Sequence, residues 1–202
     1  IILIFDEVVT GFRLAWGGAQ EYYGVVPDIA CYGKIIGGGY PLAAVAGPAD
    51  ILELSNPRKG RQDPQGTYIS GTLNGNPLAA TAGLATLIEL EKPDCYGRLN
   101  ALGERVRDGL RKISASWGIP TQVLGAGPMA NIYFTSERIV DYRSLLKHNS
   151  QISAALERTL LVSGIFTHLS AKMYMSLAHS DADVDAMLQV FGEFTEVGVT
   201  SM

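Results

Sequence analysis

Lys34 is the residue whose surroundings most clearly indicate chemistry. It lies between a short apolar run, Asp28-Ile29-Ala30-Cys31, and three consecutive glycines, Gly37–Gly39. Glycines permit tight turns and let the backbone approach closely whatever the lysine holds. A lysine amine attacks a carbonyl only in its neutral form, which burial or a nearby positive charge favours. The pattern therefore indicates a lysine placed for Schiff-base chemistry.

Asp6 is the second candidate. It follows Ile1–Phe5, an apolar run that is typical of a fully buried strand. Asp6 would then lie at the carboxyl end of a strand, where open α/β sheets bind their ligands. A pyridoxal phosphate enzyme needs both groups, because a lysine holds the cofactor and a carboxylate keeps the ring nitrogen protonated so that the ring accepts electrons.

These two features alone leave the chemistry open. An aspartate after an apolar strand is most often a loop residue or a helix cap. A Gly-Lys pair is a weaker signal still. Two nucleotide-binding motifs do not fit, because Gly33-Lys34-Ile35 lacks the Gly-x-x-x-x-Gly-Lys-Ser/Thr order and the triple glycine does not give Gly-x-Gly-x-x-Gly.

Four blocks of sequence carry a family resemblance: Phe5–Arg13, Gly24–Asp28, Gly33–Pro41 and Gly71–Leu78. In their order and spacing the chain resembles the class III pyridoxal phosphate-dependent aminotransferases, in the branch that includes glutamate-1-semialdehyde aminomutase. The similarity extends more weakly to the end of the chain. It implies an α/β fold, fold type I, comprising part of the large mixed-sheet domain and a small carboxyl-terminal α+β domain.

The resemblance assigns roles to four residues. Asp6 would pair with the pyridine nitrogen, and Val8 would pack against a face of the ring. Lys34 would form the internal aldimine and, once released by substrate, move the proton between the α-carbon and the cofactor's C4′ carbon. Thr72 would reach the cofactor phosphate of the neighbouring subunit. This last role implies a homodimer in which two chains build each active site.

The composition limits the classes of function. With 202 residues, of which 47% are hydrophobic, the chain can bury a substantial core. A net charge of -4 argues against nucleic acid or an anionic membrane as partner. Two cysteines without a Cys-x-x-Cys motif argue against a disulfide framework or a thiolate zinc site and fit a reducing compartment. With no signal-peptide pattern or transmembrane-length apolar stretch, we expect a cytoplasmic enzyme that uses small molecules and no metal.

Hydrophobic spacing and turn residues predict the secondary structure and its division. Residues 1–120 are expected to form the carboxyl-side part of the cofactor-binding domain with a connecting helix, and residues 121–202 the small domain. The irregular stretch 56–68 is expected to be an interface loop that carries Thr72 towards the partner. Strands are predicted at 1–5, 28–32, 43–46, 123–124, 129–134 and 173–177, and helices at 20–23, 48–55, 77–92, 96–117, 142–164 and from 180 onward.

The start of the chain gives a further expectation. It begins at Ile1 without an initiator methionine, whereas members of the family are much longer and carry a phosphate loop and a ring-stacking aromatic in their upstream half. We therefore expect this sequence to be the carboxyl-terminal portion of a longer enzyme. We expect that portion alone to be poorly stable and inactive.

The segment Ile165–Tyr174 bears on the reaction. In glutamate-1-semialdehyde aminomutases the corresponding stretch holds a Phe-Glu-Ala-Gly-like run whose acid lies near the cofactor, whereas here it is shorter and has no acid. We therefore expect transfer of an amino group between an amino acid or amine and an oxo acid or aldehyde. His168 or Lys172 could touch the substrate, and His179 is expected to be structural, beside a helix start. The alternatives are an intramolecular aminomutase, a racemase, or a catalytically silent or incomplete domain.

Overall fold

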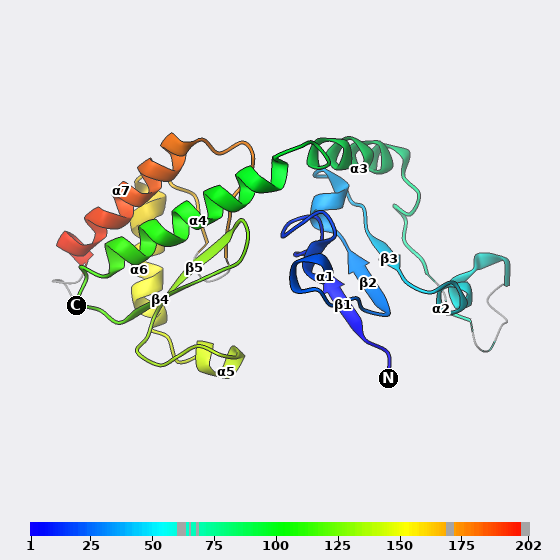
Figure 1. Cartoon of the computed structure of the whole chain (residues 1–202), viewed down its shortest axis with the longest axis horizontal. Helices are drawn as coiled ribbons and strands as arrows, with labels where there is room; N and C mark the ends of the chain where they lie inside the picture. The colour runs from blue at the N-terminus through cyan, green and yellow to red at the C-terminus, as the bar shows by residue number, and fades with distance from the viewer. Residues whose placement is uncertain (60–63, 65, 68, 169–171, 199–202) are drawn as a thin grey trace. The chain divides into compact units, whose positions relative to one another are not determined.

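The computed structural model describes residues 1–59, 64, 66–67, 69–168 and 172–198 (Figure 1). The chain forms two compact units, an N-terminal unit, Ile1–Tyr96, and a C-terminal unit, Gly97–Met202. The division differs from the boundary expected at residue 120. Helix α4, Cys95–Ser114, accounts for the difference, since its apolar face belongs to the core of the C-terminal unit.

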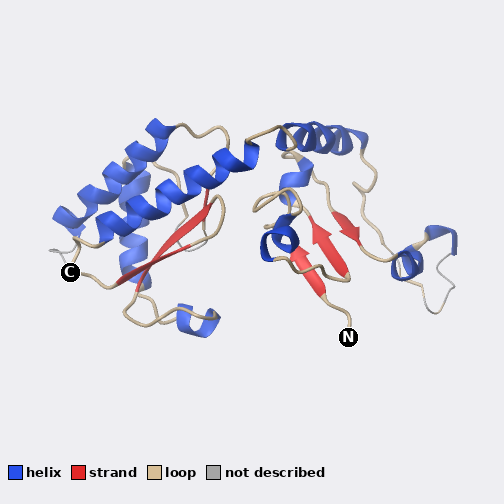
Figure 2. Ribbon diagram, in the orientation of Figure 1, coloured by secondary structure: helices blue, strands red, loops and turns tan. Residues whose placement is uncertain are grey.

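The N-terminal unit is built on a three-stranded mixed sheet in the order β1-β2-β3 (Figure 2). Strands β1, Ile4–Glu7, and β2, Ile29–Tyr32, are parallel, with Asp6 opposite Cys31. Strand β3, Ala44–Ala46, runs antiparallel to β2. The connection between the parallel strands contains helix α1, Gly18–Tyr23. The observed mixed sheet confirms the α/β fold predicted for this part of the chain.

The first strand departs from its prediction in two ways. It runs from Ile4 to Glu7 rather than over residues 1–5, and Ile1–Ile4 are exposed rather than buried. Among the described residues β1 is an edge strand with β2 as its neighbour. The segment before it is nevertheless anchored, because the carbonyl of Leu3 accepts hydrogen bonds from the backbone N–H groups of Asp28 and Ile29.

Helix α3, Pro77–Leu90, supports the turn that contains Lys34. Asn76 caps its start by accepting hydrogen bonds from two backbone N–H groups, and Pro77 occupies the first helical position. The helix packs closely on the 3₁₀ turn Lys34–Gly37, since a Cβ atom added at Gly83 would overlap the carbonyl oxygen of Ile36. Between β3 and α3 lie helix α2, Ala49–Leu52, and two further 3₁₀ turns, Glu53–Ser55 and Pro57–Lys59.

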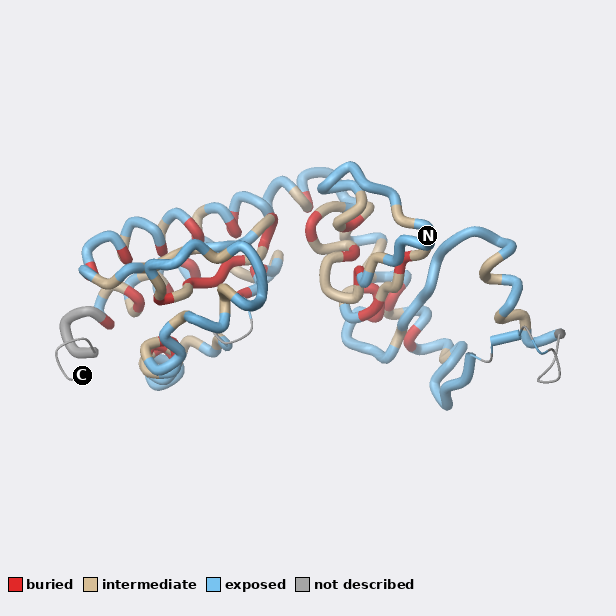
Figure 3. The backbone as a smooth tube through the Cα atoms, turned by 90° about the horizontal axis from the view of Figure 1, so that it is seen from below, coloured by how far each residue is buried: buried red, intermediate tan, exposed pale blue. Residues whose placement is uncertain are grey.

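The C-terminal unit is the α+β arrangement that the sequence predicts. Its antiparallel strands follow the order β4-β5-β6 and span Thr121–Leu124, Met129–Phe134 and Met173–Tyr174. Its further helices are α5, α6 and α7, which span Tyr142–Leu145, Ser150–Val162 and Asp181–Gly198. The buried residues of this unit gather where strands and helices face one another (Figure 3). They include Leu102, Val106, Leu110, Ile132, Phe134, Leu156, Leu160 and Phe191.

Two predictions in this unit are wrong in extent. The helix expected over 142–164 is divided into α5 and α6, because Asn149 donates its backbone N–H to Phe134 and caps α6 through its side chain. The strand expected over 173–177 ends at Tyr174, because the chain then turns and the backbone N–H of His179 bonds to the carbonyl of Ser176. The predicted start of α7 is confirmed, with Ser180 and Asp183 hydrogen bonded to each other as a capping box.

Replacement of Gly83 by alanine tests the packing of α3 on the turn at Lys34. We expect Gly83→Ala to destabilise the fold by about 1–3 kcal/mol, because the added methyl group overlaps backbone that must move. Gly97→Ala is the matched control, since Gly97 is also helical and a Cβ atom there meets nothing within 4 Å. It should stabilise the fold by about 0.5–1 kcal/mol. Urea unfolding measures both, and equal effects would contradict the packing described.

Candidate active site

Asp6 and Lys34 lie at the same edge of the sheet in the N-terminal unit. Asp6 is the penultimate residue of β1, and Lys34 follows the last residue of β2, Tyr32, by two positions. The two strands are parallel and directly paired, so their carboxyl ends meet at one edge. Both residues are exposed in this chain.

Lys34 has an unusual backbone conformation. Its φ angle of 49° lies in the left-handed region, which residues with a side chain seldom adopt. Such a conformation costs about 1–3 kcal/mol and persists only where the surrounding structure holds it. Here the following residues, Ile36 and Gly37, are buried beneath α3. The amine therefore projects from a turn that packing fixes.

Val8 completes this group of residues. A Cβ atom added at Gly33 would lie 3.3 Å from Cγ1 of Val8, so the valine packs against the backbone immediately before Lys34. The backbone N–H of Val8 donates a hydrogen bond of 3.1 Å to Oδ1 of Asp6. The structure thus brings together three of the four residues that the sequence singled out, namely Asp6, Val8 and Lys34.

Thr72 lies elsewhere in the N-terminal unit. It is exposed in the turn after the stretch 56–68, of which residues 60–63, 65 and 68 are outside the described part. It lines an open, largely apolar pocket of about 1140 Å³ together with residues of β3 and α2. Asp6, Val8 and Lys34 are not among the residues that line this pocket. Within one chain, therefore, the threonine does not join the other three.

Glu7 is a buried carboxylate that the sequence analysis missed as a separate feature. Its side chain is fully buried and accepts hydrogen bonds from the hydroxyl of Thr10 at 2.6 Å and from the backbone N–H groups of Ala19 and Gln20 at 2.8 and 3.0 Å. Strand alternation was an available signal, because successive side chains point to opposite faces and Glu7 had to point away from Asp6. The Glu7 carboxylate therefore ties the end of β1 to the connection that leads into α1.

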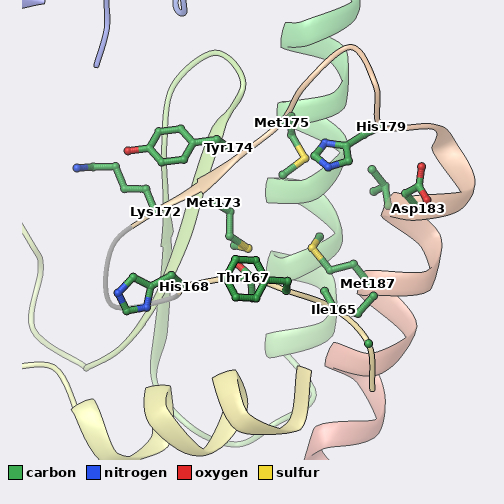
Figure 4. Close-up of a pocket in the computed structure, with 13 residues that line it drawn as sticks. Ile165, Thr167, His168, Lys172, Met173, Tyr174, Met175, His179, Asp183 and Met187 are labelled. Carbon is green, nitrogen blue, oxygen red and sulfur yellow. The ribbon is translucent and has the colours of Figure 1, made fainter. Parts of the chain in front are cut away.

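The C-terminal unit contains a separate pocket of about 550 Å³ (Figure 4). Its apolar lining includes Ile165, Met173, Met175, Val184 and Met187. Among its polar lining residues, His168 lies 2.8 Å from Oε1 of Glu157 through Nδ1. Nδ1 of His179 lies 3.1 Å from the backbone N–H of Ser176, which fits the structural role expected beside α7.

Lys172 also lines this pocket, whereas residues 169–171 of the same segment lie outside the described part. Glu157 was not foreseen as a neighbour of His168, because it comes from α6. In the described ranges, no helix has both the length and the apolar character needed to cross a bilayer. The same residues contain no cluster of three or more histidine, cysteine or acidic side chains suited to a metal ion.

Comparison with known proteins identifies the family. The fold is that of a pyridoxal phosphate-dependent transferase, and the family model "Aminotransferase class-III" matches residues 1–194. The chain belongs to the class-III aminotransferase family. It is 42% identical over 189 residues to glutamate-1-semialdehyde 2,1-aminomutase 2 of Bacillus thuringiensis strain Al Hakam, a match that covers 93% of this chain and 42% of the relative.

Solved structures give the same fold. An omega-transaminase from Sphaerobacter thermophilus superposes with a TM-score of 0.86 at 32% identity, over 97% of this chain and 44% of that one. A transaminase with pyridoxal phosphate bound superposes with a TM-score of 0.82 at 27% identity, over 96% of this chain and 44% of that one. The chain therefore spans less than half the length of these relatives. Pyridoxal 5'-phosphate is the cofactor of the family, and the carboxylate, amine and apolar side chain at one sheet edge fit it.

Tyr96 offers a test of how the loop beside this site is held. Its hydroxyl donates a hydrogen bond of 3.1 Å to the carbonyl of Phe12. Burial, followed by the nearby Cys95 and Glu21, raises the pKa of Tyr96. The folded chain thus resists ionisation of this phenol, whereas the unfolded chain ionises it near pH 10. The stability that this difference provides is complete below about pH 10 and is lost as the pH rises above it.

We therefore expect the free energy of unfolding to fall as the pH rises above about 10 in the wild-type chain, and to fall less steeply in Tyr96→Phe. The variant should also lose about 0.5–1.5 kcal/mol at neutral pH, because the hydrogen bond to Phe12 is absent. Urea titrations across this range measure both effects. Tyr23→Phe, at an exposed position of the same unit, is the control. Parallel curves for Tyr96→Phe and the wild type would contradict the interpretation.

Proposed function

We propose that this chain carries the catalytic lysine and aspartate of an aminotransferase that moves an amino group between an amino acid or amine and an oxo acid or aldehyde. The observation that supports it is the placement of Asp6 and Lys34 at one edge of two paired parallel strands. Pyridoxal phosphate, when bound, supplies an electron sink for the carbanion that forms at the substrate's α-carbon. The protein supplies position, charge and proton transfer.

Lys34 would hold the cofactor and then act as the base that removes and returns the proton at the substrate α-carbon. A general base must reach that proton with little loss of orientation, so a fixed backbone is an advantage. The left-handed turn under α3 provides it. This role requires the neutral amine, which a closed and dry site favours.

Asp6 would face the ring nitrogen and keep it protonated, because an opposite charge close to a titratable group favours its charged form. The hydrogen bond from the backbone of Val8 restricts the orientation of this carboxylate. The Val8 side chain would cover one face of the ring and exclude water there. Exclusion of water strengthens the electrostatic interaction between the carboxylate and the ring.

Transfer between two molecules is our preferred reaction. Two features support it: the segment 165–174 contains no acidic residue, and the omega-transaminase match reaches 32% identity. The second candidate is intramolecular transfer of the glutamate-1-semialdehyde aminomutase type, which the 42% identity to a relative of that name favours. The two differ in one respect that can be measured, because only the first requires a separate amino acceptor.

We also propose that the enzyme is a cytoplasmic homodimer in which Thr72 contacts the cofactor phosphate of the partner's site. Thr72 lies apart from Lys34 and Asp6 within one chain and lines an open apolar pocket. Helix α3 exposes Leu78, Leu84 and Ile88, and a helix that is apolar on all sides is normally buried. A partner subunit that covers these surfaces would explain both features.

Replacement of the two proposed catalytic residues tests the site directly. In the holoenzyme, Lys34→Ala should abolish the visible absorption of the bound cofactor and lower turnover by about 10²–10⁴-fold or more, because the amine that moves the proton is gone. Asp6→Asn should retain the lysine-bound cofactor but lower turnover by about 10²-fold or more, because the ring nitrogen loses its counter-charge.

The controls for these variants are Lys92→Ala and Asp50→Asn, which remove exposed groups of the same charges from the N-terminal unit. Both should keep wild-type turnover. Turnover is measured with and without an added oxo acceptor, so that intermolecular and intramolecular transfer are separated. A Lys34→Ala enzyme with full turnover would refute the proposal.

A mixing experiment tests the shared active site. Lys34→Ala and Thr72→Ala subunits are each expected to form impaired homodimers. A mixed dimer would contain one site with both residues intact, because its lysine and its threonine come from different chains. After subunits are exchanged in equal amounts, activity should recover to about a quarter of the wild-type value. No recovery, in dimers shown to be mixed by mass, would contradict the role proposed for Thr72.

A further inference from the structure

Glu7 lies between two residues of the proposed site and takes no part in the chemistry assigned above. Its side chain has no exposed surface, which is rare for a carboxylate and costly unless hydrogen bonds compensate. Three donors compensate here, the hydroxyl of Thr10 and the backbone N–H groups of Ala19 and Gln20. None of these donors comes from β1 itself, so the contacts tie the strand to the connection that follows it.

Gly18 and Gly11 lie close to the side chain and the backbone of Glu7. Gly18 has a φ of 73°, and a Cβ atom there would lie 2.6 Å from Oε2 of Glu7. The backbone carbonyl of Glu7 is also engaged, since it accepts a hydrogen bond of 2.8 Å from the N–H of Gly11. A side chain at Gly11 would lie 2.7 Å from that same carbonyl oxygen. Both the backbone and the side chain of Glu7 are therefore fixed.

Fixing Glu7 also fixes its neighbours. Successive residues of a strand point to opposite faces, so the direction of Glu7, the last residue of β1, sets the direction of Asp6. Oδ1 of Asp6 accepts the backbone N–H of Val8, which begins the turn that Glu7 anchors. Val8 in turn packs on the backbone of Gly33, next to Lys34.

We infer that Glu7 is a positioning residue for the proposed reaction, which directs the Asp6 carboxylate towards the ring nitrogen by anchoring the end of β1 to the connection 10–20. The inference rests on the proposed function. It assigns Glu7 no contact with substrate or cofactor. Its effect on catalysis passes entirely through the orientation of Asp6, and this separates it from a residue that only stabilises the fold.

Three variants test the anchor. Glu7→Gln keeps the shape of the side chain but replaces one acceptor oxygen with an NH₂ group that must face a donor. Thr10→Val removes one donor at nearly constant volume, and Thr10→Ser retains it. Glu21→Gln is the matched control, because Glu21 is an exposed carboxylate in α1 that bonds a backbone N–H group, and glutamine keeps an acceptor oxygen.

The first measurement is hydrogen exchange in the protein without cofactor. In Glu7→Gln the amides of Ala19 and Gln20 should exchange at least about tenfold faster, because each loses a charged acceptor. Thr10→Val should give a smaller increase, and Thr10→Ser and Glu21→Gln should match the wild type. Unchanged exchange in Glu7→Gln would refute the anchor itself, whatever the reaction of the enzyme.

The second measurement uses the holoenzyme loaded with pyridoxal phosphate labelled with ¹⁵N in its ring. In Glu7→Gln the ring-nitrogen signal should move towards that of the unprotonated ring, in the same direction as in Asp6→Asn and by a smaller amount. Thr10→Val should follow Glu7→Gln, and Thr10→Ser should match the wild type. A normal signal in a folded Glu7→Gln enzyme would overturn the positioning role.

A double-mutant cycle on kcat/KM completes the test. If Glu7 acts through Asp6, Glu7→Gln should lower kcat/KM by about tenfold in the wild-type background and have little further effect in Asp6→Asn. Additive losses would mean that Glu7 acts independently of Asp6, and would overturn the inference. If Asp6→Asn changes neither the ring-nitrogen signal nor kcat/KM, the proposed function is wrong. This outcome does not depend on any result at Glu7, so the two failures can be told apart.

Discussion

The parallel pairing of β1 with β2 is the constraint on which the site depends. Parallel strands have their carboxyl ends at one edge, and their register places Asp6 opposite Cys31, three residues before Lys34. A shift of one residue would turn Asp6 to the opposite face and put Glu7 in its place. The proposed chemistry therefore depends on a register that main-chain hydrogen bonds fix.

Two sets of close contacts hold the segments that follow these strands. At the end of β1, the buried carboxylate of Glu7 accepts hydrogen bonds from Thr10, Ala19 and Gln20. Beyond β2, α3 packs so tightly on the turn after Lys34 that only glycine fits at position 83. Both arrangements hold loops rather than strands, which accords with the general finding that functional residues lie on loops positioned by a rigid scaffold.

Much of the fold could be predicted from local signals in the sequence. Apolar periodicity located most helices and strands, and the motif around Asp6 and Lys34 indicated both the family and the cofactor. The break between α5 and α6 escaped prediction because Asn149 bonds to Phe134, a contact with a distant strand. The left-handed conformation of Lys34 escaped it because tertiary packing, rather than residue type, imposes that backbone.

The two units differ in the size of the apolar core that their described residues bury. The C-terminal unit buries a large apolar cluster among its own elements, although side chains such as Leu146 and Phe166 stay exposed. In the N-terminal unit, β1 and α3 leave large apolar side chains exposed. Such surfaces commonly mark places where other protein is bound.

Reduction of the holoenzyme with borohydride, followed by peptide mapping, tests the central claim most directly. Borohydride makes the bond between a lysine and pyridoxal phosphate permanent, so the labelled peptide identifies the residue that holds the cofactor. We expect the label on Lys34 and loss of the visible absorption band on reduction. A label on any other lysine, or no label in a protein saturated with cofactor, would contradict it.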